Sequence, residues 1–522
     1  MARSKQTRFR RVKLSLSDLV GRDYVNAVCK TRARLTGESE KMLRAIATEK
    51  IDFYPKEVHE ALIDLLPQLG KKFGATLNKS ACGVTTCAFV NNSHIDLSPL
   101  TGLGYYRVSE SGKLHIISKS EHYHASVGHT FPGYRLIDNA RKLGILNATH
   151  NNTRGHITRL LEEELVRVAA GIEPGDRAAL DRVINSKSKS VLNRVINLGT
   201  GSISAEAAIK LVLSRFYKVQ GDSPKPKYAG RVPVIMVLGD ADGNTQGNYH
   251  GTTIAGQLLR GMWPKLCDAF EKSNTMLVRA LRPNSIGDLE AAFKKYDKGK
   301  YKIAGFFHEL IMMNYAATEI TRQFIRKAYS LCKKHDVPTI VDEIQTCVWS
   351  PEVLMFREYG IKPSIVVVGK GFPGGEFSAS RILFNSDLDC LPQFGALITN
   401  GQEELSALAY LITMRWVEEN AEVTGAVGEY FYERLAALAE AYPDYISGIE
   451  GRRHLAGIGF LDLLKAKDFA ARINEMGLDI SVQSYKANCP PSALVKMPLV
   501  AGYEAVDAVI ARMNIAMAAV AR

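Results

Sequence analysis

The chain has 522 residues, 46% hydrophobic and 23% charged, which is ordinary for a globular protein and enough for two or three domains. No apolar run approaches the roughly 20 residues needed to span a bilayer, so the sequence predicts no membrane segment. The formal net charge is +13. The basic residues form no stripe interleaved with aromatic side chains, which argues against nucleic acid and leaves solvated faces or an anionic small molecule as explanations.

The amino terminus and the cysteines indicate the compartment. Residues 2–11 are basic, but no apolar segment follows, so they are not a secretory signal; we expect a disordered arm, with a transit peptide as the alternative. The eight cysteines are sparse, and the closest pair, Cys82 and Cys87, lacks the spacing of a metal knuckle. We therefore expect reduced thiols, no metal site and a cytoplasmic protein.

Residues 1–125 read as an amino-terminal extension and part of a small domain. Helical periodicity covers Leu14–Glu49 and Pro55–Leu69, and Tyr105–Val108 with Leu114–Ile117 predicts a hairpin. The extension is long enough for its helices to cover a pocket, which we state as a hypothesis.

Strands alternate with helices from about 126 to 417. The predicted strands are Val234–Leu238, Thr275–Ala280, Ile303–Phe307, Pro338–Val341, Ile365–Val368 and Arg381–Phe384. The predicted helices are Ser204–Tyr217, Ile286–Tyr296, Glu319–His335 and Leu405–Asn420. This alternation predicts an α/β fold whose large domain is a mostly parallel, doubly wound sheet.

Residues 418–522 predict a carboxyl-terminal part of the smaller α+β domain. Its predicted helices are Tyr430–Ala441, Lys467–Met476 and Ala505–Ala521, and its predicted strands are Gly457–Leu461 and Ile480–Gln483.

Two strands of the large domain end in side chains that suit one cofactor. An all-apolar β-branched strand stops at Gly369-Lys370, and another stops at Asp342-Glu343. Ligands of doubly wound sheets bind at the carboxyl ends of strands. Pyridoxal phosphate needs a lysine for its Schiff base and an acidic partner for its ring nitrogen. Taken alone, a lysine after an apolar strand is usually a solvated strand end.

Three further segments point to the same cofactor. Thr200-Gly201-Ser202 opens a strong helix whose free amides could bind phosphate, although a capped helix without a ligand is the ordinary alternative. Tyr249, before His250 in a loop after a strand, could stack on a flat cofactor or simply pack in a turn. Glu309 ends another strand, where it is usually solvated.

Together these segments resemble the class III, ornithine- and omega-type aminotransferases of pyridoxal phosphate (PLP) fold type I. The resemblance covers roughly 100–520, and its most specific stretches are Val341–Thr346, Tyr359–Pro363 and Val368–Gly371.

The resemblance implies a role for each candidate residue. Lys370 would form the Schiff base and move protons, Asp342 would pair with the ring nitrogen, and Gln345 would hydrogen-bond the phenolic oxygen. The remaining cofactor-binding candidates are Thr200, Gly201 and Ser202 for the phosphate, Tyr249 with His250 beside the ring, Glu309, and Thr399. In this family Thr399 would reach the phosphate of the neighbouring subunit, which implies a homodimer with shared active sites.

The sequence departs from the family on the substrate side. Cys347 stands where many members have glycine, and Lys496 stands where many have an arginine that clamps the substrate carboxylate. Cys347 and Trp349 could line a remodelled pocket or simply pack. Glutamate as the routine amino donor is therefore in question.

The resemblance favours an aminotransferase that moves an amino group between an amino acid or amine and an oxo acid or aldehyde. The alternative keeps PLP but performs β/γ-replacement, carbon–carbon bond formation, decarboxylation or an aminomutase reaction on an unusual anionic substrate. A third alternative is a non-catalytic binding protein on the same fold, against which the intact Lys370, Asp342 and Gln345 argue.

Overall fold

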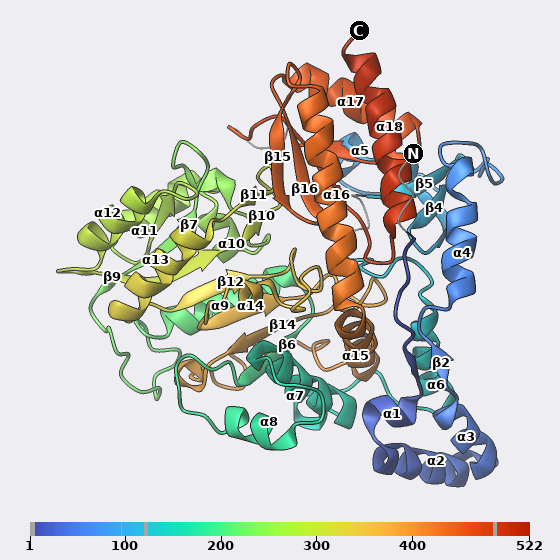
Figure 1. The fold of residues 1–522 in the computed structure, drawn as a ribbon. Coiled ribbons are helices and arrows are strands. Elements are labelled where there is room, and N and C mark those ends of the chain that lie inside the picture. Colours follow the sequence, from blue (N-terminus) through green and yellow to red (C-terminus); the bar gives the residue numbers. More distant parts are fainter. Residues whose placement is uncertain (1–5, 95–96, 119–123, 484–487) are drawn as a thin grey trace.

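A seven-stranded sheet occupies the middle of the larger part of the molecule (Figure 1). The computed structural model describes residues 6–94, 97–118, 124–483 and 488–522. The strand order is β6-β14-β13-β12-β9-β7-β8. Only β14 runs antiparallel to its neighbours in this sheet, so the predicted mostly parallel arrangement is confirmed. The strands are β6 (Arg194–Leu198), β7 (Val232–Leu238), β8 (Leu277–Leu281), β9 (Tyr301–His308), β12 (Thr339–Asp342), β13 (Ile365–Val368) and β14 (Ser380–Phe384).

Both faces of this sheet are buried, as a doubly wound fold requires. In β13, Ile365 and Val367 pack into one hydrophobic core with α9, whereas Val366 and Val368 pack into a second core with α13. A strand with two buried faces needs no polar alternation, which explains its continuous β-branched sequence. The helices of this part are α6 (Arg135–Lys142), α7 (His156–Ala170), α8 (Arg177–Ile184), α9 (Gly201–Leu213), α10 (Ile254–Leu259), α11 (Pro264–Lys272), α12 (Ile286–Tyr296), α13 (Arg322–Lys334), α14 (Met355–Glu358) and α15 (Glu404–Glu419).

The predicted start of one helix is wrong. Glu319 belongs to a short strand, β11 (Thr318–Glu319), which pairs with β10 (Ile311–Met312). Helix α13 begins only at Arg322, because the Thr321 hydroxyl accepts a hydrogen bond from the Phe324 amide at 3.3 Å and caps the helix.

The amino- and carboxyl-terminal segments share a smaller α+β unit. The predicted hairpin is present as β4 (Tyr106–Ser109) and β5 (Leu114–Ile117), and β5 pairs in parallel with β17 (Leu478–Asp479) near the other end of the chain. The carboxyl-terminal elements are α16 (Ala421–Ala441), β15 (Ile446–Arg452), β16 (Leu455–Phe460), α17 (Leu463–Glu475), β17, β18 (Ser481–Val482), β19 (Ser492–Lys496) and α18 (Tyr503–Val520). The exact domain boundaries at 125/126 and 417/418 stay predictions.

The amino-terminal extension holds β1 (Lys13–Leu14), α1 (Leu16–Val20), α2 (Arg22–Thr36), α3 (Glu40–Thr48), β2 (Ile51–Asp52), α4 (Lys56–Asp64), α5 (Cys87–Asn92) and β3 (Pro99–Leu103). The expected disordered arm lies partly outside the described residues, at 1–5. The rest of it is packed: Thr7 donates its amide and hydroxyl to Glu504 at 3.0 and 2.8 Å, and Phe9 packs against Tyr54 and Trp416.

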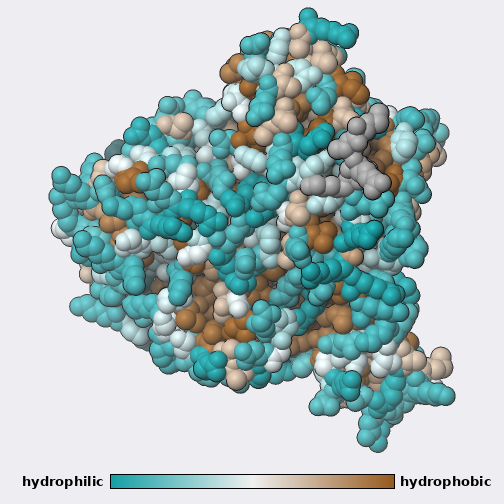
Figure 2. All heavy atoms as spheres, viewed as in Figure 1, coloured by the Kyte–Doolittle hydropathy of each residue, from teal (hydrophilic) through white to brown (hydrophobic). Residues whose placement is uncertain are grey.

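The face seen in Figure 2 is mostly polar, with apolar side chains gathered in a band below its centre. In the part of the chain that the structure describes, no helix combines the length and apolarity needed to cross a bilayer.

Asp336, between α13 and β12, binds a cluster of cations. It pairs with Arg215, with Lys227 at 2.6 Å and with Lys189 at 3.5 Å, and it accepts a hydrogen bond from the Tyr228 hydroxyl. Burial opposes ionisation, but these partners outweigh it and hold the pKa of Asp336 well below its usual range.

We expect Asp336→Asn to lower the free energy of unfolding at pH 7 by about 1–2 kcal/mol, an effect reduced by partial exposure of the side chain. A depressed carboxyl pKa stabilises the fold above the ordinary pKa of aspartate and loses that contribution as the pH falls below about 4. Thermal melts of wild type and variant should therefore differ at pH 7 and converge on acidification. Asp387→Asn, which removes a single contact to Lys189 at 3.0 Å, is the matched control. A constant difference across this pH range would contradict the assignment.

Candidate active site

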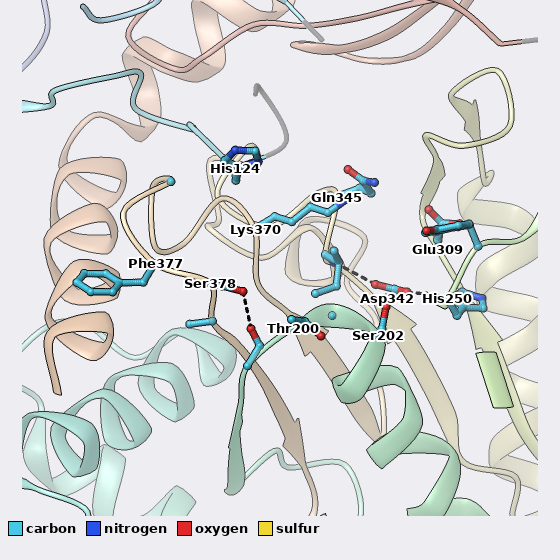
Figure 3. A pocket seen from close by; sticks show the side chains of 17 residues that line it. His124, Thr200, Ser202, His250, Glu309, Asp342, Gln345, Lys370, Phe377 and Ser378 are labelled. Carbon is cyan, nitrogen blue, oxygen red and sulfur yellow. Dashed lines mark hydrogen bonds and ion pairs between the residues drawn. The ribbon is translucent and has the colours of Figure 1, made fainter. Parts of the chain in front are cut away.

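A cavity of about 500 Å³ lies at the carboxyl ends of β9, β12 and β13. Three side chains that directly end or follow these strands line it: Glu309 after β9, Asp342 at the end of β12, and Lys370 after β13 (Figure 3). The structure also brings Thr200, Gly201, Ser202, Tyr249, His250 and Gln345 to the same cavity. All predicted site residues except Thr399 are therefore neighbours within one chain.

Lys370 projects across this cavity towards Gln345 (Figure 3). Its backbone adopts a left-handed conformation with φ of 37°, which is costly for a residue with a side chain and typical of functional turns. Burial lowers the pKa of Lys370, while the carboxylates of Asp342 and Glu309 oppose this shift. A lowered pKa raises the fraction of neutral amine, which is the nucleophilic form.

Asp342 and His250 form a buried pair in the floor of the cavity. The Nδ1 of His250 donates to Oδ2 of Asp342 at 2.8 Å, and the Ile344 amide donates to Oδ1 at 3.1 Å. The His250 ring stacks on Phe307 with centroids 3.9 Å apart. Two donors and a stacked ring fix the orientation of the carboxylate, which leaves its remaining acceptor capacity for a group in the cavity.

The start of helix α9 forms another wall. Thr200 is the residue before its first turn and makes no capping hydrogen bond through its side chain. The Ser202 hydroxyl accepts from the Thr252 amide at 3.1 Å, and a Cβ added at Gly251 would lie 2.6 Å from the Ser202 Cα. Glycine thus lets the loop after β7 approach the helix start, where amides and the helix dipole favour an anion.

Gln345 and Tyr249 complete the predicted set. Gln345 is 6% exposed, and among the described residues its Oε1 has no hydrogen-bond partner although it is buried. Such an atom is costly unless a ligand satisfies it. The guanidinium carbon of Arg260 lies over the Tyr249 ring, 5.6 Å from the centroid of that ring.

Thr399 lies in an exposed turn and does not line the cavity of its own chain. No described residue before His124 lines it either, so the described helices of the extension do not line the cavity of their own chain.

The departures on the substrate side prove to be buried packing. Cys347 is fully buried and its thiol donates to the Gly369 carbonyl at 3.2 Å. The amino group of Lys496 lies 3.6 Å from the centroid of the Trp349 ring, and it donates a hydrogen bond to the main-chain carbonyl of Gln345 at 2.8 Å. Burial holds the pKa of Lys496 well below its usual value, and the charge of Lys370 lowers it further. Its amino group therefore supports the loop that carries Gln345 through this hydrogen bond.

Sequence reasoning missed His124, Phe377 and Ser378, which also line the cavity. The Ser378 hydroxyl donates to the Gly199 carbonyl at 3.1 Å and ties the loop after Lys370 to the loop before α9. The glycines that precede Phe377 mark a loop, but no local pattern specifies which strand end it meets.

Comparison with known proteins agrees with this geometry. The family model for Aminotransferase class-III matches residues 132–512. The chain is 25% identical over 321 residues to an acetylornithine aminotransferase of Aquifex aeolicus, covering 61% of this chain and 75% of that protein. It is 26% identical over 335 residues to an ornithine aminotransferase of Schizosaccharomyces pombe, covering 59% and 70%.

The fold is similar to that of an ornithine aminotransferase from Toxoplasma gondii whose active site holds PLP at partial occupancy. The TM-score is 0.64 at 18% identity, with 83% of this chain and 94% of that chain covered. The family match spans well over half of the sequence and includes Lys370 and Asp342. The chain therefore belongs to the class-III aminotransferases, enzymes that depend on pyridoxal phosphate.

Proposed function

We propose that this enzyme transfers an amino group between an amino acid or amine and an oxo acid or aldehyde, with Lys370 as the residue that binds the cofactor covalently. The observation that carries this proposal is the meeting of Lys370, Asp342, Gln345 and the start of α9 in one cavity. The names of the relatives make ornithine and acetylornithine the first donors to test.

The residues present fit PLP group by group. The amides at the start of α9 suit its phosphate, the oriented Asp342 carboxylate suits its ring nitrogen, and Gln345 lines the cavity with a side-chain amide that can hydrogen-bond a polar ring substituent. When bound, PLP supplies an electron sink next to the carbon that loses a proton.

The chain itself supplies positioning and proton transfer. Asp342, oriented by His250, would pair with the ring nitrogen of bound PLP, and a carboxylate there would favour the protonated ring. The amine of Lys370, whose pKa is lowered by burial, would accept and return a proton at the substrate carbon. Tyr249 and Glu309 line the same cavity and would contact the ring or the substrate.

The test is the visible spectrum of the purified protein with and without donors. Ornithine or acetylornithine should convert bound PLP to its amino form, and an added oxo acid such as 2-oxoglutarate should restore the starting spectrum. A donor that is consumed without formation of the amino form would favour replacement, bond formation, decarboxylation or an aminomutase reaction instead. Protein that binds no PLP would overturn the proposal.

The charge of the substrate stays a prediction that the same assay can test. Among the described lining residues, the cavity contains no arginine, and its carboxylates are Glu309 and Asp342. Comparing ornithine with 1,4-diaminobutane, which lacks the carboxylate, measures what an anionic substrate group contributes. A loss of kcat/KM of a hundredfold or more with the diamine would support an anionic substrate.

We also propose a homodimer with shared active sites. The exposed turn that carries Thr399 and the 81%-exposed Phe394 nearby support this, since both lie outside the cavity of their own chain. The eight cysteines, all without a disulfide, support the expectation of a reducing compartment such as the cytoplasm.

Co-expression of two inactive variants tests whether the two subunits share their active sites. A Lys370→Ala chain lacks the reactive amine, and a Thr399→Glu chain would repel the phosphate bound in its partner. Because a mixed dimer places both defects in one site and leaves the other intact, co-expression should restore about a quarter of wild-type activity, given random pairing of two equal pools. Recovery to no more than the residual activity of the separate variants would contradict a shared site.

A further inference from the structure

A second cavity lies at the opposite edge of the large sheet from the candidate active site. It has a volume of about 520 Å³. Its floor includes Thr339 at the amino end of β12 and Ser364 just before β13. Because β14 is antiparallel to β13, its carboxyl end also reaches this edge, and Asn385 and Leu388 complete the floor. Residues of helix α13 form one wall. We call this cavity the rear cleft.

The rear cleft is electropositive. Its lining contains five basic side chains, Lys189, Arg215, Arg326, Lys333 and Lys362, against the two carboxylates of Asp336 and Asp387. Both carboxylates are already engaged, Asp336 by Arg215, Lys189 and Lys227, and Asp387 by Lys189.

Three of the cations remain for a ligand. Arg326, Lys333 and Lys362 are exposed, and among residues 6–94, 97–118, 124–483 and 488–522 none of them forms an ion pair. Arg326 and Lys333 are seven residues apart on α13, which places them two turns apart on one helix face. Convergent positive charge around a concavity attracts and retains anions.

The volume and the apolar lining of the rear cleft indicate a ligand larger than a simple inorganic ion. A volume of about 520 Å³ is typical of sites for small organic ligands. Ile361, Val337 and Leu388, all less than 10% exposed, provide an apolar surface beside the cationic rim. A ligand that satisfies both surfaces carries a negatively charged group on an apolar or planar body.

A hydrogen-bonded path joins the rear cleft to the candidate active site. Tyr329 of α13 lines the cleft, and its hydroxyl lies 3.1 Å from Nε2 of His308. The Nδ1 of the same histidine lies 3.1 Å from the carbonyl oxygen of Glu309, whose side chain lines the active-site cavity. Burial lowers the pKa of His308 to about 4, so the ring is neutral and donates through one nitrogen only.

We propose that the rear cleft is an effector site for an organic phosphate about the size of a nucleoside monophosphate. The phosphate lies between Arg326, Lys333 and Lys362, and the organic body lies against Ile361 and Leu388. A ligand that displaces Tyr329 moves the hydrogen-bond partner of His308, which shifts Glu309 and alters turnover.

Binding of AMP to the PLP-saturated enzyme tests the site, because saturation occupies the phosphate-binding start of α9. We expect calorimetry to detect AMP binding that weakens at least about tenfold in the Arg326→Glu/Lys333→Glu variant and weakens with added salt. Lys294→Glu, an exposed change on α12 outside both cavities, should alter Kd less than twofold. Equal AMP affinity in the double variant, or no AMP binding by wild type, would overturn the site.

Two comparisons test the ligand class and the path. If citrate binds more tightly than AMP, the site does not prefer a phosphate group. If inorganic phosphate binds as tightly as AMP, the apolar surface contributes nothing and the site does not select an organic phosphate. In the holoenzyme, AMP should change kcat for wild type and leave kcat unchanged in Tyr329→Phe, which lacks the hydroxyl but keeps the cleft. An AMP effect of equal size in Tyr329→Phe would overturn the path.

Discussion

Replacing Lys370 with alanine is expected to abolish turnover. The substitution removes the amine proposed to bind PLP, and Lys370 is the only lysine among the described residues that line the cavity. Loss of general acid–base catalysis alone costs about 10²–10⁴-fold in rate, and loss of the covalent link adds to this. The variant protein should also lack the visible absorption of lysine-bound PLP.

Lys294→Ala is the control for this variant. Lys294 is exposed on α12 and lines neither the active-site cavity nor the rear cleft. Its removal should leave the spectrum and kcat unchanged. Turnover by Lys370→Ala within tenfold of wild type would contradict the assignment of Lys370.

Asp342→Asn should reduce kcat by about a hundredfold or more while the protein stays folded. The amide keeps the size of the carboxylate but removes the charge that faces His250 and Lys370. A preorganised charge in a buried site contributes about 3–4 kcal/mol to a transition state, which corresponds to this loss. Steady-state kinetics on PLP-saturated protein measure the effect.

The pH profile distinguishes an electrostatic role of Asp342 from a structural one. The Asp342 charge raises the pKa of Lys370, so its removal should shift the basic inflection of the profile towards lower pH. An unshifted profile with a proportional loss of thermal stability would instead indicate that Asp342 only supports the fold.

The adjacent carboxylate offers a control. Glu343 is fully buried and accepts from the amides of Met355 and Phe356 at 2.8 and 2.6 Å, on the side of α14. Glu343→Gln should therefore lower the melting temperature and leave kcat of the folded protein unchanged.

The parts of the fold that the sequence predicted best are those where local and tertiary signals agree. The bounds of β13 and α12 match the predicted Ile365–Val368 and Ile286–Tyr296. In β13 every residue is β-branched and buried, and in α12 the Ser285 hydroxyl caps the first turn.

Elements defined by tertiary partners were not predictable in this way. Strand β6, Arg194–Leu198, was missed because Arg194 and Asn197 interrupt its apolar pattern, and it is a strand only because it pairs with β14. In the candidate site, strand ends placed Lys370, Asp342 and Glu309 together. The bracing of Gln345 by Lys496 joins positions 151 residues apart, and nothing near either residue indicates it.

The contact between Thr7 and Glu504 joins positions 497 residues apart, and it constrains how the chain matures during synthesis. At about 5–20 residues per second, translation of the whole sequence takes about 25–100 s. The central sheet uses residues 194–384 and can form before the later segments are made, whereas β5 awaits β17 and Phe9 awaits Trp416. Their apolar surface is therefore available to chaperones until these partners emerge, and a stop codon before α18 would remove Glu504, the partner of Thr7.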